Sequence, residues 1–310
     1  MAWVASLATV VPATVCVAWL IGRIVSDRFA WSQWLLWIPT PAVLVAVVAG
    51  LAAACRPDEV PGRRRRRLIA WSATGGVLLV FFSFIEHRFL RPAPGGDATL
   101  RLVHASVQAT GPRVLDVYGE GLTALDGDVT IVSSLLPMRS INRLIDRLDG
   151  VGDPVTVWPF VMFTKLPVLE ARPLVDNDDL RVVVYRVDAT ATMGHVVTIW
   201  VIDLPSNPWR QRHAIAKRAR RILDTVTSDP PDLVVGDFNM TRGSESLAIV
   251  FPDLSHAFDE AGRGYAASFR RSLPLYHIDH TLLADTVRAV SYDLVDIGVG
   301  RHLVQVTDLR

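Results

Sequence analysis

A short motif in the second half of the chain has residue types suited to phosphate chemistry. Residues 233–239 read LVVGDFN, an aliphatic run followed by a glycine, Asp237 and Asn239. Side chains two positions apart on a strand face the same side, so this carboxylate and this amide can together hold a phosphate or orient a water. A plain turn after a buried strand also uses Gly, Asp and Asn. The motif alone does not separate these two interpretations.

Three motifs in a fixed order resemble those of the endonuclease/exonuclease/phosphatase superfamily, which has the fold of DNase I. GDFN lies about seventy residues before the C-terminus, and roughly forty residues after it YHIDHTLL contains Ile278, Asp279 and His280, where the family has an IDH or LDY element. The final segment, GVGRHLVQVTDL, aligns through His302 with the family's SDH element. The resemblance covers residues 100–310 and implies an α/β fold, a two-sheet αββα sandwich.

The resemblance implies four catalytic residues, Asp237, Asn239, Asp279 and His302. It pairs Asp279 with His302 and places the other two across the scissile phosphate from that pair. A carboxylate bound to one imidazole nitrogen fixes the tautomer and raises the basicity of the other nitrogen. That suits His302 to activate water or to bind a phosphoryl oxygen.

The family's divalent-metal site is only partly represented. Ser106 stands where the family's first strand ends in Asn, and Ser133 and Ser134 stand where its second strand ends in Gln and the metal-binding Glu. Arg301 replaces the Asp of the SDH element. Mg²⁺ prefers carboxylate oxygens, and a guanidinium close to a metal ion repels it. The sequence therefore predicts a degenerate metal site.

Three interpretations of the altered site remain open. In the first, Asp203, which stands at or next to the position of a family histidine, rebuilds a displaced Mg²⁺ or Mn²⁺ site with Asp237. In the second, Arg301 replaces the cation and binds phosphate together with Ser106 and Ser134, because arginine can hold a phosphate bidentately. In the third, the domain no longer catalyses a reaction and is a pseudoenzyme.

The segments that must position these residues predict a domain with more strands than helices. Residues 208–227 show helical spacing, with apolar side chains on one side and Arg and Lys more nearly on the other. Short β-branched runs recur at 100–107, 129–132, 155–163, 180–187, 195–202, 233–235, 278–283 and 302–306. A packed pair of sheets flanked by helices is the expected architecture.

The first 90 residues predict a membrane anchor. Residues 3–21, 33–54 and 68–85 contain no charge, and each run can cross a hydrocarbon core of about 30 Å. A buried soluble helix normally keeps a polar face, and the first run lacks the basic start and cleavage site of a signal peptide. We therefore expect three transmembrane helices in residues 1–90, and the Pro/Gly-rich stretch 91–99 as a linker.

Basic residues in the short loops predict the orientation of this anchor. Only Arg23 and Arg28 lie between the first two runs, whereas Arg56 and the arginines at 63–67 lie between the second and third. Arginine is retained on the cytoplasmic side, so the N-terminus should be cytoplasmic and residues 100–310 extracytoplasmic, in a multi-pass protein of the bacterial inner membrane. A nucleic-acid or anionic-lipid patch is the alternative explanation of the arginine run.

Charge argues against nucleic acid as a partner of the outer domain. From residue 100 onward there are 20 Arg and 2 Lys against 26 acidic residues, whereas affinity for DNA comes mainly from neutralising phosphates. Both cysteines, Cys16 and Cys55, lie in the predicted anchor, so no disulfide is expected in the domain.

Two functions remain on these grounds. The first is a catalytically degenerate protein that binds a phosphorylated lipid or envelope glycan precursor, or that docks a membrane protein complex. The alternative is an active phosphoester hydrolase on lipid-linked or head-group phosphates. The lipid bilayer is a partner in both cases, and Trp31, Trp34 and Trp37 suit interfacial anchoring. A site held at the bilayer raises the effective concentration of a lipid ligand.

Overall fold

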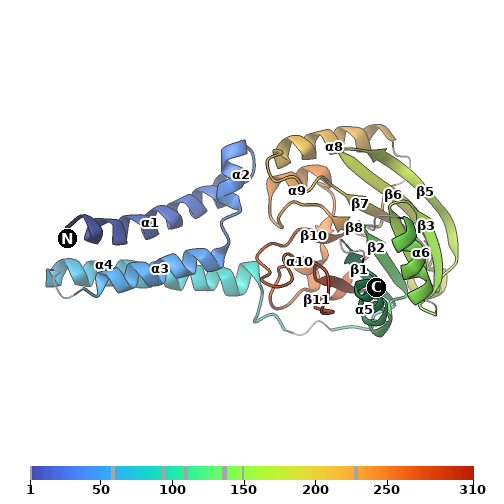
Figure 1. The fold of residues 1–310 in the computed structure, drawn as a ribbon, viewed down its shortest axis with the longest axis horizontal. Helices are drawn as coiled ribbons and strands as arrows, with labels where there is room; N and C mark the ends of the chain where they lie inside the picture. Colours follow the sequence, from blue (N-terminus) through green and yellow to red (C-terminus); the bar gives the residue numbers. More distant parts are fainter. Residues whose placement is uncertain are drawn as a thin grey trace.

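The computed structural model describes residues 2–56, 60–92, 95–107, 111–134, 138–148, 150–226 and 230–310, with side chains from residue 8 onward except at position 138. An elongated helical section projects from an α/β domain, and the N-terminus lies at its far end (Figure 1). The helical section contains α1 (Ala2–Val25), α2 (Ala30–Leu36), α3 (Thr40–Ala54), α4 (Pro61–Val80) and the π-helical segment η1 (Phe81–Glu86).

Two six-stranded sheets form the centre of the domain. The first has the strand order β11-β12-β1-β2-β4-β3 and the second β5-β6-β7-β8-β10-β9. The first sheet consists of β1 (Leu100–Ser106), β2 (Val129–Ser133), β3 (Asp153–Val157), β4 (Phe160–Thr164), β11 (Ala289–Val295) and β12 (Val304–Leu309). The second consists of β5 (Val168–Asn177), β6 (Leu180–Asp188), β7 (Val196–Asp203), β8 (Leu233–Asp237), β9 (Ser255–His256) and β10 (Asp279–Leu283).

Helices cover the outer face of each sheet. α5 (Pro112–Ala124) and α6 (Met138–Arg147) pack on the first sheet, and α8 (Arg212–Val226) and α9 (Glu245–Val250) pack on the second. The short helices α7 (Thr190–Met193) and α10 (Ala257–Ala261) lie between strands in sequence. The predicted αββα sandwich is therefore confirmed for the domain.

Strand β7 illustrates why the central strands are continuous apolar runs in the sequence. Val197, Ile199 and Val201 join the core between the sheets, whereas Trp200 and Ile202 join the core under α8 and α9. A strand covered on both faces needs apolar residues at every position. The two cores fix the end of β7 and its neighbour β8, where Asp203 and Asp237 lie side by side in register.

Several predicted elements differ in detail. The run 155–163 forms two antiparallel strands, β3 and β4, because Trp158 and Pro159 make the turn between them. The helix predicted from 208 begins at Arg212, since the Asn207 side chain accepts a hydrogen bond from Trp209 N (3.0 Å) and holds a turn there. Residue 227 of that prediction, like residues 93 and 94 of the linker, lies outside the described residues.

In the helical section, one of the three predicted spans is not a single helix. Two helices are long and apolar enough to cross a membrane, Ala8–Val25 and Pro61–Glu86. The middle run is instead split into α2 and α3, which meet at 70°. Pro39 lacks an amide hydrogen and disfavours helical geometry in the residue before it, so α2 stops short of it. Alone, the 15 residues of α3 reach only about 22 Å.

The corrected middle span bears directly on the predicted orientation. Each complete crossing reverses the side on which the following segment lies. If the N-terminus is cytoplasmic, as predicted, residues 100–310 are extracytoplasmic only when the bent pair α2 and α3 acts as one crossing. Membrane insertion and orientation both stay predictions.

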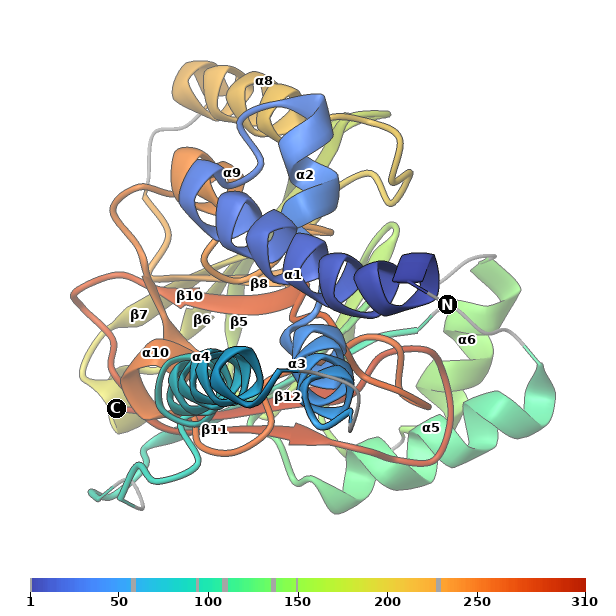
Figure 2. The same cartoon turned by 90° about the vertical axis from the view of Figure 1, so that its left-hand side faces the viewer.

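The connection between α1 and α2 is fixed to the domain at the start of α9. Ser26 Oγ accepts a hydrogen bond from Glu245 N (2.9 Å), and Asp27 Oδ1 accepts one from Ser246 N (3.1 Å). The first amides of a helix have no partner within it, so these two side chains cap α9 from outside the domain. Figure 2 shows α2 beside α8 and α9.

A second set of contacts joins α2 to the loop before α8. The Gln33 side chain donates to Pro208 O (2.9 Å) and accepts from Arg212 N (2.7 Å). At η1, the Arg242 side chain of the domain donates to the backbone carbonyl of Glu86. The helical section is thus held against the domain at separate points, beyond the covalent connection at residues 87–99.

Candidate functional site

The three predicted acidic and histidine residues meet where the two sheets approach each other. Asp279 begins β10 and is paired in register with Asp237 at the end of β8. His302 precedes β12 of the other sheet, and its Nδ1 lies 2.9 Å from Asp279 Oδ2. His302 Nε2 lies 3.9 Å from Asp237 Oδ2. All three side chains are buried.

Asn239 also lies at this site, but it is positioned by a turn after β8 and not by the alternation of side chains along a strand. β8 ends at Asp237, and Asn239 adopts a left-handed backbone conformation (φ 52°), which asparagine tolerates better than most residues. Its amide N–H donates to Asp237 Oδ1 (3.0 Å), and its side chain donates to Leu204 O (2.9 Å). A turn, and not the alternation of a strand, therefore brings the predicted carboxylate and amide together.

Electrostatics favour the charged form of His302. Burial disfavours an imidazolium, but Asp279, and then Asp237, outweigh it and raise the pKa of His302 to about 9. Burial also acts to raise the pKa of Asp279, yet His302 holds it below its usual value. At neutral pH, His302 therefore carries protons on both nitrogens. Its Nε2 has no hydrogen-bond partner among the described residues, which leaves a donor for an anion.

The pKa of Asp237 is shifted in the opposite direction from that of Asp279. Burial, followed by the negative charge of Asp279, raises its pKa well above the ordinary range. A carboxyl group in this environment binds a proton more readily than a free one does. Asp237 is therefore a stronger base than an exposed aspartate.

Ser268 is a site residue that the motifs did not indicate. Its hydroxyl donates to Asp279 Oδ2 (2.5 Å) and lies 3.3 Å from the amide nitrogen of Asp279, which donates to it. The serine fixes the carboxylate that in turn orients His302. It lies in the loop before β10, where the sequence has no pattern that would single it out.

A cavity of about 440 Å³ opens beside His302, and we call it the cationic pocket. Its lining includes Arg212, Arg270, Arg301 and His302 and contains no Asp or Glu. Arg270 and Arg301 are exposed, and neither guanidinium has an ion-pair or hydrogen-bond partner in the described part of the chain. Such a pocket suits an anion with several oxygen acceptors.

Arg212 supports this pocket from a buried position. Its guanidinium donates to the carbonyls of Pro205, Ser206 (3.3 Å) and Asn207 (3.2 Å), and it lies over the ring of Trp37 at 5.7 Å. Trp37 comes from the connection between α2 and α3, and it also lines the pocket. The helical section therefore contributes directly to the site.

A second cavity, of about 260 Å³, lies on the other side of Asn239, and we call it the acidic pocket. Asp178, Asp203 and Asp237 line it together with Arg181. Burial raises the pKa of Asp203 to about 6. Both pockets share Asn239 and Ser206 in their linings, so they form two parts of one cleft.

The predicted phosphate-binding residues are divided among three places. Arg301 lines the cationic pocket, and Ser134 lines the acidic pocket. Ser106 is buried at the end of β1, its hydroxyl has no partner among the described residues, and it lines neither pocket. Ser133, the neighbour of Ser134, is bonded to His104 Nε2 at 2.9 Å.

The described residues favour an anion over a resident divalent ion. Ligand atoms of Asp237, Asp279 and His302 lie within 4.8 Å of one another, but His302 and Ser268 already engage the Asp279 carboxylate in hydrogen bonds. Asp178, Asp203 and Asp237 supply three carboxylates to the acidic pocket, where Arg181 competes with a cation. No carboxylate comes from the described end of β2.

A second histidine cluster, His256, His277 and His280, also has the spacing of a metal site. His256 Nδ1 accepts from Phe258 N (3.0 Å), and its Nε2 lies 2.7 Å from His280 Nδ1. His280 Nε2 in turn donates to Met240 O (2.8 Å). This network assigns the proton of His256 to Nε2. A metal on His256 Nε2 would displace this proton and break the hydrogen bond to His280, so the cluster is a hydrogen-bonded part of the core.

A chain of buried hydrogen bonds continues from His277 across the sandwich. His277 Nε2 lies 3.1 Å from Tyr292 OH, which donates to Gln305 Oε1 (2.8 Å), and Gln305 Nε2 lies 2.7 Å from His104 Nδ1. Since Tyr292 donates its only proton to Gln305, His277 must be the donor to Tyr292. Each of these side chains forms at least one buried hydrogen bond, while His277 Nδ1 has no partner among the described residues.

Replacing Tyr292 by phenylalanine is expected to destabilise the fold by about 1–3 kcal/mol, because His277 Nε2–H loses its buried acceptor. Chemical denaturation of the full chain in detergent measures this. Tyr118→Phe is the matched control, because the hydroxyl of the equally buried Tyr118 has no partner among the described residues. Equal losses in the two variants would contradict the network.

Comparison with solved structures places the domain in a known fold. The chain is similar to a mannosyl-6-phosphatase of Bacteroides thetaiotaomicron VPI-5482, with 12% identity, a TM-score of 0.57, and coverage of 68% of this chain and 99% of that chain. An endonuclease/exonuclease/phosphatase family protein of the same species has 11% identity, a TM-score of 0.56, and coverage of 68% and 94%. A humanized D. rerio TDP2 has 15% identity, a TM-score of 0.53, and coverage of 68% and 98%.

The domain therefore has the endonuclease/exonuclease/phosphatase fold, which is that of DNase I. No family model and no curated protein matches the chain. At these identities the likeness concerns the fold, and what the site does must be argued from its own residues.

Proposed function

We propose that the domain binds a phosphate ester with arginine and imidazolium groups in place of a divalent cation, and that it is a binding protein of catalytically degenerate type. The cationic pocket is the observation that carries this proposal. Arg270, Arg301 and His302 line one cavity without a carboxylate among its lining residues. Arginine forks match the oxygens of a phosphate, and His302 Nε2 adds a further donor.

The ligand we propose is a phosphorylated molecule of the cell envelope, held at the surface of the bilayer. Trp37 of the helical section lines the pocket, and two helices of that section have the length and composition of membrane spans. One protein of the same fold is a mannosyl-6-phosphatase, which agrees with phosphate-ester chemistry on this architecture.

Hydrolysis is a second candidate, and the pairing of Asp279 with His302 favours it. A protonated His302 can donate its Nε2 proton to a leaving oxygen, and Asp237, with its raised pKa, can accept a proton from an attacking water. The water oxygen would bond to phosphorus while the ester bond to the leaving oxygen breaks. In this scheme the chain's own residues supply both the acid and the base.

The test is calorimetric titration of inorganic phosphate into the full chain in detergent, first with a chelator and then with Mg²⁺. We expect the same affinity in both conditions, and no turnover of p-nitrophenyl phosphate or its diester. A tenfold gain in affinity with Mg²⁺, lost in Asp203→Asn, would overturn the proposal in favour of a rebuilt metal site. Turnover in chelator that disappears in His302→Ala would establish the second candidate.

A further inference from the structure

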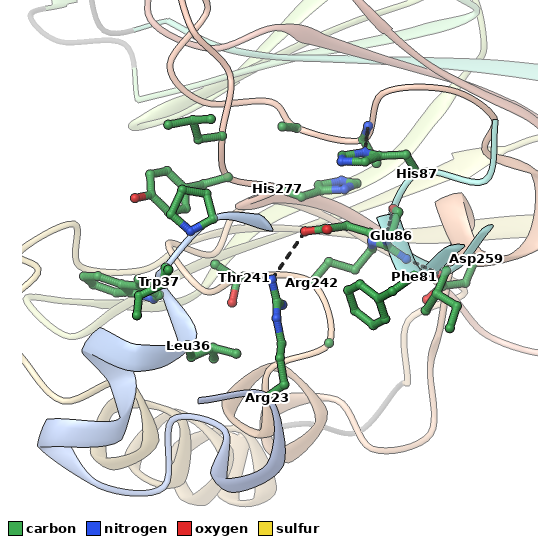
Figure 3. A pocket seen from close by; sticks show the side chains of 18 residues that line it. Arg23, Leu36, Trp37, Phe81, Glu86, His87, Thr241, Arg242, Asp259 and His277 are labelled. Carbon is green, nitrogen blue, oxygen red and sulfur yellow. Dashed lines mark hydrogen bonds and ion pairs between the residues drawn. The ribbon is translucent and has the colours of Figure 1, made fainter. Parts of the chain in front are cut away.

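A separate cavity of about 290 Å³ lies between the helical section and the domain, and we call it the interface cavity. Arg23 of α1, Phe81 and Glu86 of η1, and Thr241 and His277 of the domain are among its lining residues. In Figure 3, Arg23 points across the cavity toward Glu86, and these two side chains form an ion pair of 3.4 Å. The cavity exists only because the helical section is docked on the domain.

The polar lining of the interface cavity is incompletely satisfied. Four atoms of its lining residues, Arg23 Nε, Glu86 Oε2, Thr241 Oγ1 and His277 Nδ1, are buried and have no partner among the described residues. His277 is only 6% exposed, and because its Nε2 is the donor to Tyr292, its Nδ1 presents a lone pair. Buried polar atoms normally have partners, so four together indicate a ligand.

These atoms define what the ligand must offer. Arg23 Nε–H is a donor, Glu86 Oε2 and His277 Nδ1 are acceptors, and the Thr241 hydroxyl can act as either. The complementary group therefore carries both hydroxyl donors and carbonyl or ester acceptors. A glycerol unit with one ester linkage and one free hydroxyl meets this description.

The interface cavity also has apolar lining residues. Leu36, Phe81 and Ile85 are among them, and Ile85 is 57% exposed on the surface of the helical section. An alkyl chain that leaves the cavity beside Ile85 runs along a helix which is apolar enough to span a membrane. These residues therefore suit the start of an acyl chain.

The interface cavity is adjacent to the cationic pocket. Trp37, Thr241 and Tyr276 line both. A single ligand can therefore place its phosphate near His302, its glycerol and ester group beside Thr241 and Glu86, and its chain between the helices.

We propose that the ligand of the site is a monoacyl glycerophospholipid with a phosphate head group, whose glycerol, with its free hydroxyl, and first acyl segment occupy the interface cavity. This inference rests on the proposed phosphate-binding function of the cationic pocket. It makes the helical section a part of the binding site, because that section supplies the apolar wall and two of the four unpartnered polar atoms.

The test compares two probes on the full chain in phosphatidylcholine nanodiscs, glycerol 3-phosphate and a short-chain monoacyl phosphatidic acid, which keeps one free hydroxyl. Ile85→Trp fills the apolar part of the interface cavity. Phe84→Trp is the matched control, because Phe84 lies in the same segment, is 52% exposed and lines none of the three cavities described above. We expect the wild type to bind the monoacyl phosphatidic acid at least tenfold more tightly than glycerol 3-phosphate. This gain should be lost in Ile85→Trp and kept in Phe84→Trp.

The two probes separate failure of this inference from failure of the proposed function. Unchanged affinity of Ile85→Trp for glycerol 3-phosphate shows that its cationic pocket is folded. If the gain with the monoacyl phosphatidic acid then persists in Ile85→Trp, the lipid does not use the interface cavity and the inference is overturned. If the wild type binds neither probe, the proposed function fails, and the lipid inference fails with it.

Discussion

Replacing Arg270 and Arg301 together by alanine is expected to weaken the binding of inorganic phosphate at least a hundredfold. Each guanidinium lines the cationic pocket without a competing partner among the described residues. A hydrogen bond to a charged group contributes about 1.5–3 kcal/mol, so the loss of two corresponds to roughly 3–6 kcal/mol. Calorimetric titration of the full chain measures this directly.

Two further variants sharpen this prediction. Arg263→Ala removes an exposed arginine from a separate cavity beside Ser291 and Asp293, and it should change phosphate affinity less than twofold. Arg301→Lys keeps the charge but loses the planar fork, so we expect an intermediate loss. A double variant that binds phosphate as tightly as Arg263→Ala would show that the ligand lies elsewhere.

Asp279→Asn is expected to destabilise the full chain by about 3–5 kcal/mol, because it leaves the buried His302 without its carboxylate partner. The variant should also change how stability depends on pH. In the wild type the pKa of His302 is raised from 6.5 to about 9 in the folded state. A raised histidine pKa gives stability that is fully present below the unfolded value and is lost as pH rises through the folded value.

The corresponding measurement is chemical denaturation at a series of pH values between 6 and 10. Wild-type stability should fall by about 3 kcal/mol across this range from His302 alone, and the fall should be much smaller in Asp279→Asn. Ser268→Ala serves as the control, since it removes a hydroxyl bonded to Asp279 and leaves the pair of Asp279 and His302 in place. It should cost about 1 kcal/mol and keep the slope. Parallel curves for the wild type and Asp279→Asn would show that the pair does not hold a charged histidine.

The docked helical section changes how the site should be studied. Gln33 holds the loop that contains Pro208 and the first amide of α8, and Trp37 lines the cationic pocket. A fragment limited to residues 100–310 lacks both contacts. The full chain is therefore the appropriate material for all of the measurements above.

The sequence was sufficient to predict the architecture of the domain. Its aliphatic runs and the order of the GDFN, IDH and final histidine motifs predicted the two-sheet sandwich, because strands buried on both faces require apolar residues throughout. The same motifs indicated Asp237, Asn239, Asp279 and His302, which the structure brings together. Edge strands such as β5 escaped notice, since its mixed polar pattern and Pro173 resemble a loop.

Only the tertiary structure decided what surrounds these residues. Ser268 and Arg270 come from an irregular loop, and Trp37 comes from a break in a predicted span, so no local periodicity marks them as site residues. The lining of a pocket depends on which distant segments pack together, and the docking of α2 on the loop before α8 sets that for Trp37 and Arg212. Local sequence patterns indicate which face of a helix or strand is buried. A site, in contrast, is built from contacts between different elements.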